Sequence, residues 1–86
     1  MRYNIAMFRV PVQEMLAVLR GRVTFVLPEN LVVENVNYSY QCNALEVYVS
    51  HPSFPPVPAG CMVPMLMQTV RYDPENKQIV TVELLK

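Results

Sequence analysis

Prolines are concentrated in one short stretch of the chain, HPSFPPVPAGC, which runs from His51 to Cys61. Four of the eight prolines lie here, beside the only histidine and one of the two cysteines. Proline fixes φ and removes a backbone N–H, so neither a helix nor a central strand can run through this stretch. Its possible roles are a ligand for a partner, a metal or catalytic loop, or a stiff connection between strands.

A structural role for this proline loop accounts for most of its residues. PSFP and PPVP have the P-x-x-P spacing of SH3 and WW ligands, but no basic residue to fix their direction occurs between Arg22 and Arg71. Phe54 and Val57 are apolar and suitably spaced to enter a core, and prolines reduce the entropy lost when a loop becomes ordered. We therefore expect an ordered cover over a sheet edge, with an interface arm as the alternative.

The apolar content of the chain is high for its size. Its 86 residues predict a single domain over residues 1–86, and 52% of them are apolar whereas only 16% are charged. An ordinary soluble domain has roughly 45–50% and about 25%. One helix of about ten residues would cover only part of one sheet face, so the excess apolar surface predicts a homo-oligomer, a dimer or higher.

Several partners and locations are not expected from the sequence. Prolines interrupt every long uncharged run, so no stretch resembles a membrane helix of about 20 apolar residues. No apolar signal-peptide core precedes Arg9 and Pro11, which predicts a cytoplasmic protein. The formal net charge is zero and the basic residues are scattered, so neither nucleic acid nor anionic lipid is an expected partner.

An α-helix is predicted over Pro11–Arg20. Proline is tolerated in the first turn, and Gly21 stands where a helix commonly ends in the left-handed conformation. Glu14 lies in the first turn and Arg20 in the last, as the helix dipole favours. The apolar residues of the segment fall at helical spacing on one face: Val12, Met15, Leu16 and Leu19.

Most of the remaining chain is predicted to be strand. Arg2–Phe8 suits a first strand, whereas Val23–Leu27 fits a strand and an extended connection equally well. Alternation on both sides of the QCNA turn predicts one hairpin, and MLMQTVRY and QIVTVELL around DPENK predict a second. The expected fold is α+β, an antiparallel sheet of four to five strands with one short helix packed on one face, and no parallel crossover is needed.

Metal binding and catalysis find little support in the sequence. Cys42, His51 and Cys61 are single residues nine and ten positions apart, far from the paired spacing of zinc ligands. A Cys–His pair for nucleophilic catalysis would need an orienting group, and the only aspartate, Asp73, belongs to the DPENK turn. We predict no metal, no cofactor and no catalytic residue, and we expect both cysteines to be buried and reduced.

The aromatic and methionine residues suggest contact surfaces. Tyr38 and Tyr40 share one strand face that could stack on a base, but without a basic groove such a face more often packs under a helix. The cluster of Met62, Met65 and Met67 fits either a core or a contact surface. The candidates for ligand or interface contacts, bordering a pocket between subunits, are Tyr38, Tyr40, Tyr48, His51, Ser53, Phe54 and Arg71.

Three segments, VPVQEMLAVL, LPENLVVENVNYSY and ALEVYVSHPSFPPVPAG, resemble a group of short bacteriophage proteins. The shared pattern is a VPV-led helix, an LPE turn and an HPSFPxVPxG loop, and it covers roughly Val10 to Pro64. The present chain departs by inserting RGRVTFV before the LPE turn and by adding the DPEN hairpin. The resemblance implies a phage accessory protein and carries no catalytic residues.

These observations lead to one functional hypothesis and one alternative. We expect a phage-encoded, non-enzymatic binding module that acts as a homo-oligomer in the host cytoplasm. It would antagonise a host system by binding a host protein or by sequestering a nucleotide-like small molecule. The alternative is a structural or assembly-associated small phage protein.

Overall fold

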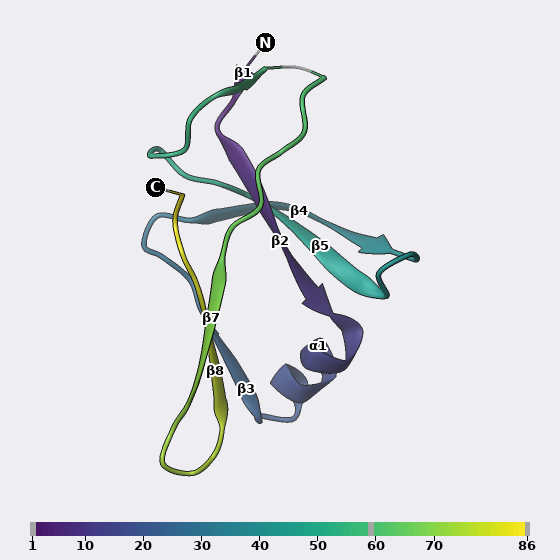
Figure 1. The fold of residues 1–86 in the computed structure, drawn as a ribbon, viewed down its shortest axis with the longest axis vertical. Helices are drawn as coiled ribbons and strands as arrows, with labels where there is room; N and C mark the ends of the chain where they lie inside the picture. The colour runs from purple at the N-terminus through teal and green to yellow at the C-terminus, as the bar shows by residue number, and fades with distance from the viewer. Residues whose placement is uncertain (1, 59, 86) are drawn as a thin grey trace.

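The computed structural model describes residues 2–58 and 60–85, and strands dominate this part of the chain (Figure 1). One short helix accompanies them, so the α+β class is confirmed. The elements are β1 (Arg2–Tyr3), β2 (Ile5–Pro11), α1 (Val12–Leu19), β3 (Val23–Val26), β4 (Val32–Ser39), β5 (Ala44–Ser50), β6 (Val57–Pro58), β7 (Gln68–Tyr72) and β8 (Gln78–Val82).

The strands form two three-stranded sheets and one two-stranded pair. The first sheet has the order β2-β5-β4, the second has the order β3-β8-β7, and β1 pairs with β6. Both predicted hairpins are present, because β4 pairs with β5 and β7 with β8 in antiparallel register. The expected single sheet of four to five strands is not confirmed, since the described strands divide between separate ladders.

Backbone contacts around Met7 connect the two large sheets. The Met7 N–H donates to the Pro64 carbonyl at 3.0 Å, and the Leu66 N–H donates to the Met7 carbonyl at 2.8 Å. The segment before β7 thus runs parallel to the outer edge of β2, with an isolated bridge between Met7 and Met65. The Gln68 side chain adds a bond from Nε2 to the Arg9 carbonyl at 3.0 Å.

One pairing differs in direction from the expectation. The segment that fitted a strand or a connection is strand β3, and it pairs with β8 in parallel. The expectation that no parallel crossover is needed was therefore wrong. A parallel pair requires a connection of a dozen or more residues, and the whole β4–β5 hairpin and the proline loop lie between these two strands.

The DPENK turn is closed by a side-chain acceptor and a left-handed asparagine. The Asp73 side chain accepts the backbone N–H groups of Glu75 and Lys77, both at 2.8 Å. Asn76 adopts φ 64°, a left-handed conformation that asparagine tolerates better than most residues. These contacts close the β7–β8 hairpin locally.

Helix α1 ends as its sequence predicts, but it packs less closely than expected. Gly21 has φ 75°, its N–H donates to Val18 O, and the Arg22 N–H donates to Ala17 O, which together form a Schellman cap. Met15 contacts the core, whereas Leu16 and Leu19 are exposed and no residue of α1 is buried. The predicted apolar face is therefore only partly used, because the helix contacts β2 and β3 at the margin of the sheets.

No helix in the described ranges is long and apolar enough to cross a membrane.

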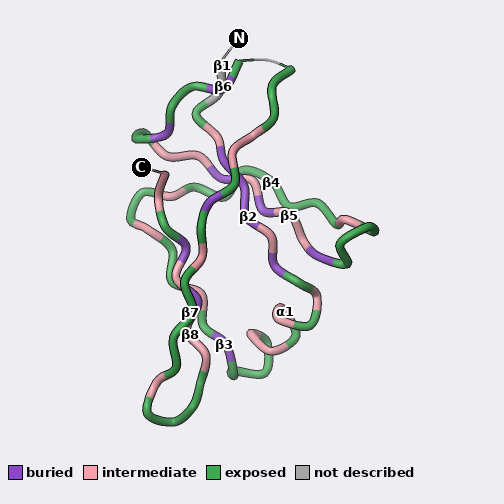
Figure 2. The backbone as a smooth tube through the Cα atoms, viewed as in Figure 1, coloured by how far each residue is buried: buried purple, intermediate pink, exposed green. Residues whose placement is uncertain are grey.

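The described residues of the proline loop pack into the fold. Val57 and Pro58 pair with β1, and the Phe54 ring is only 2% exposed within the main hydrophobic cluster. The Asn4 side chain donates from Nδ2 to the Phe54 carbonyl at 2.8 Å, which fixes the loop against the start of β2. Burial is concentrated where the sheets and this loop meet (Figure 2).

Three groups of side chains are more exposed than the sequence suggested. Tyr38 and Tyr40 lie in contact with solvent and not under the helix. Met62, Met65 and Met67 are also exposed, which fits a contact surface and does not fit a core. Cys42 and Cys61 are both exposed free thiols, so the expectation of buried cysteines was wrong. Each cysteine lies in a loop outside the ladders, where apolar neighbours in sequence do not imply burial.

We predict that Phe54→Ala destabilises the protein by about 3–5 kcal/mol, as expected for truncation of a fully buried phenylalanine. Urea denaturation followed by circular dichroism measures this change. The matched control is Pro55→Ala, which alters the adjacent exposed residue of the same loop. An unchanged midpoint for Phe54→Ala would show that the loop does not contribute to the core.

We also predict that both thiols react in the native protein. Exposed thiols are accessible without unfolding, so a disulfide reagent such as DTNB should titrate two thiols per chain. The reaction should have a similar rate with and without denaturant. Cys42→Ser and Cys61→Ser assign each reaction. Titration of fewer than two thiols until urea is added would contradict the exposed positions.

Candidate functional site

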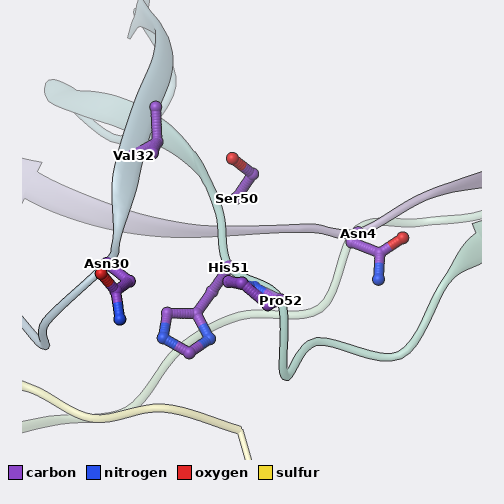
Figure 3. A pocket seen from close by; sticks show the side chains of 6 residues that line it. All are labelled: Asn4, Asn30, Val32, Ser50, His51 and Pro52. Carbon is purple, nitrogen blue, oxygen red and sulfur yellow. The ribbon is translucent and has the colours of Figure 1, made fainter.

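An open pocket of about 530 Å³ lies where the proline loop meets the first sheet. Its volume falls in the range of small-molecule sites, about 300–1,000 Å³. Figure 3 shows the imidazole of His51 beside the side chain of Asn30, with Val32 and Ser50 on one side and Asn4 on another. The lining residues are Asn4, Asn30, Val32, Ser50, His51 and Pro52.

Local backbone features bring these residues together. Asn30 adopts φ 63° in the turn that enters β4, where the Leu31 N–H donates to the Pro28 carbonyl at 3.4 Å. His51 directly follows β5, and its backbone N–H donates to the Asn4 carbonyl at 3.4 Å. The pocket is therefore built from chain segments before β2, before β4 and after β5.

The His51 side chain connects two loops. Its Nδ1 accepts the Ser53 backbone N–H at 3.0 Å and lies 2.7 Å from Ser53 Oγ. Because Nδ1 accepts the backbone N–H, the ring proton belongs on Nε2, which donates to the Glu29 carbonyl at 3.0 Å. The ring also lies against Phe54, with the two centroids 5.5 Å apart. Both ring nitrogens thus have structural partners.

This geometry does not suit nucleophilic catalysis. In a serine nucleophile pair, the histidine nitrogen must be available to take the hydroxyl proton, but the Nδ1 lone pair here is shared with the Ser53 N–H. Nε2 meets a neutral carbonyl where an orienting carboxylate would be needed. Burial raises the pKa of the Glu14 carboxyl above its ordinary value, but Glu14 lies on α1 and not in the pocket lining.

A second pocket of about 290 Å³ is lined by residues of β2, of β5 and of the segment before β7. The Arg9 guanidinium forms an ion pair with Glu46 at 3.2 Å and approaches the Met65 sulfur at 3.8 Å. The lining residues are Met7, Arg9, Glu46, Tyr48, Met62, Val63 and Met65. Methionine, tyrosine and arginine are among the residue types enriched in protein interfaces. The charges of Arg9 and Glu46 neutralise each other, so the lining has no net charge.

The predicted candidates fall into separate groups. His51, Ser53 and Phe54 lie together in the proline loop. Tyr38 and Tyr40 form an edge-to-face pair with centroids 4.9 Å apart, on the β4–β5 hairpin. The two remaining candidates lie elsewhere, Tyr48 in the second pocket and Arg71 on β7 outside both pocket linings. In the part of the chain that the structure describes, no cluster of three or more His, Cys, Asp or Glu side chains could hold a metal ion.

Of the six residues that line the pocket, only His51 was among the sequence candidates. Asn4 and Asn30 reach the pocket through tertiary contacts, and nothing in their immediate sequence links them to His51. A weak signal existed for Asn30, because the PEN sequence after a strand is typical of a turn with a left-handed residue.

No protein-family model matches the chain, and neither the curated proteins nor the solved structures include one that is similar to it. The resemblance to bacteriophage proteins therefore stays a prediction.

We predict that a fluorophosphonate probe, which reacts with activated serines, does not label the protein. The Ser53 backbone N–H shares the Nδ1 lone pair that Ser53 Oγ would use, and Nε2 faces a neutral carbonyl, so the hydroxyl should be no more nucleophilic than that of free serine. Intact-mass spectrometry after incubation measures labelling. Labelling that disappears in Ser53→Ala would contradict a purely structural His51–Ser53 contact.

Proposed function

We propose that this chain is a non-enzymatic binding module that works as a homo-oligomer. In this proposal it is encoded by a bacteriophage and acts in the cytoplasm of the host cell. It antagonises a host system by binding a host protein or by sequestering a nucleotide-like small molecule.

The pocket beside His51 is the observation that carries the binding role. It is preformed, because hydrogen bonds of His51 and Asn4 fix its walls from the proline loop and the start of β2. Val32 and Pro52 supply apolar surface, and the Asn30 amide offers a donor and an acceptor beside them. Such a lining suits a flat, uncharged heterocycle with polar edges.

The pocket chemistry favours the base of a nucleotide-like ligand over its phosphates. Among its lining residues there is no lysine or arginine to pair with an anion, and the candidate Arg71 lies on β7. Phosphate groups of a bound ligand would therefore extend toward solvent. A neutral nucleobase or nucleoside is the simplest probe of this site.

The alternative is a structural or assembly-associated phage protein. It is supported by β4, an eight-residue strand at the edge of the first sheet whose residues are nearly all exposed. The exposed side chains of such a strand are available for contact with other chains. This role would need no ligand in the His51 pocket.

We predict that the protein purified from infected cells releases a small molecule on denaturation, detected by liquid chromatography and mass spectrometry. A panel of nucleobases and nucleosides should raise the melting temperature of protein freed of that molecule. Asn30→Gly keeps the left-handed backbone but removes the amide, and it should weaken binding about tenfold through the loss of one hydrogen bond.

Thr24→Ser serves as the matched control, because it changes an exposed residue outside the pocket lining. The small-molecule role fails if no compound is released and no probe changes the melting temperature. In that case, affinity purification from an infected host extract decides between a bound host protein and a phage assembly partner.

A further inference from the structure

The inner face of the first sheet is covered unevenly. Residues directly opposite each other in adjacent strands point to the same face, so the register defines three rows that cross the sheet from β2 through β5 to β4. The rows are Ala6–Val49–Val33, Phe8–Val47–Val36 and Val10–Leu45–Tyr38.

Each row begins in the core and ends in solvent. The β2 members are all buried, and those on β5 are buried or packed against the core. On β4, however, Val33, Val36 and Tyr38 are 49%, 47% and 44% exposed. These three side chains, which we call the β4 strip, extend the core face beyond the cover supplied by the second sheet and the proline loop. Figure 1 shows the β4–β5 hairpin projecting away from β7 and β8.

The edge of β4 is less suited than its face to joining another chain. The ladder is irregular between Val33 and Asn35, as a bulge would make it. The backbone N–H of Val36 donates to its neighbour's side-chain oxygen, Asn35 Oδ1, at 2.9 Å. Bulges and satisfied donors reduce edge-to-edge pairing. A partner is therefore expected to pack on the side chains of the strip.

The surface area of the chain indicates how large the missing cover is. A folded monomer of 9.9 kDa should expose about 5,200 Å², whereas this chain exposes 6139 Å². The excess of about 900 Å² belongs to the whole chain, of which the β4 strip is one part, and it is close to the roughly 800 Å² that each partner buries in a standard stable interface. The radius of gyration is 13.8 Å, whereas about 12 Å is expected for a compact chain of this length, and the shortest dimension is 16 Å. Both values agree with a sheet whose apolar face is not fully covered.

The β4 strip is built for an apolar, self-complementary contact. It contains no charged residue, and apolar interfaces of this kind are typical of homodimers. The hydroxyl of Tyr38 donates to Asn43 Oδ1 at 2.6 Å, and its ring packs edge-to-face with Tyr40, so little freedom is lost when a partner binds. Without charge to select a foreign partner, the occupant that fits is a second copy.

We infer that two copies of this chain pack β4 strip against β4 strip about a twofold axis, so that each covers the open end of the other's core. This inference rests on the proposed homo-oligomer and assigns its interface. In an isologous contact the middle of the patch lies nearest the axis, which places Val36 close to Val36 of the partner subunit.

Light scattering during gel filtration tests this interface. The wild-type chain should elute at micromolar concentration with twice the mass of one chain. Val36→Lys and Val36→Glu should each be monomeric, with dimer dissociation constants more than about 100-fold higher, because two like charges then meet across the axis in an apolar contact. An equimolar mixture of the two variants should recover the dimer, because opposite charges then meet.

Val70→Lys is the matched control, since Val70 is 51% exposed at the centre of β7, an edge strand of the other sheet. It should remain dimeric, and circular dichroism spectra that match the wild type in all variants exclude unfolding as the cause. A monomeric wild type overturns both the proposed oligomer and this interface. A dimer that survives both Val36 changes overturns the interface alone, and monomeric variants that do not recover on mixing overturn the twofold arrangement.

Discussion

The fold depends on the two backbone hydrogen bonds between Met7 and the segment that leads into β7. Local turns close each hairpin, and α1 contacts β2 and β3 only at the margin of the two sheets. The Met7 bonds hold the segment from Pro64 to Leu66 beside β2. They thereby place Leu66 and β8 over Phe8 and Val10. Phe54 enters the same cluster from the proline loop. Because the core is assembled at this junction, most residues of the edge strands β4 and β7 are left in solvent.

This arrangement explains which elements the sequence could predict. The two hairpins and the end of α1 are determined by neighbours in the chain, namely alternation, the Asp73 side chain and the left-handed Gly21. The direction of the β3–β8 pair and the irregular ladder at Glu34 depend on partners tens of residues away, about which alternation carries no information. Leu16 and Leu19 were assigned to the core because helical periodicity identifies an apolar face but not whether a sheet is large enough to cover it.

The candidate site shows the same division. His51, Ser53 and Phe54 could be recognised together because the proline loop places them within four residues. Asn4 and Asn30 could not, since only the meeting of β2 and β4 with that loop brings their amides to His51. Tyr38 and Tyr40 were expected to pack under the helix but are exposed, because their burial depends on how far the covering elements extend along the sheet. The exposed cysteines follow the same rule, because a loop residue is buried only if another element reaches it.

The parallel pairing of β3 with β8 has a consequence for how the chain folds during its synthesis. Val26 and Gln78 are separated by about 50 residues, so the ladder that holds β3 forms only after a large loop has closed. At about 5–20 residues per second, β3 leaves the ribosome seconds before its partner exists. During that interval the β2–β5–β4 sheet can form, but its core face has neither Leu66 nor Val82 upon it. The nascent protein is thus most prone to aggregation after β5 has emerged and before β8 has, which is the period when a chaperone or a neighbouring nascent copy would meet its bare sheet.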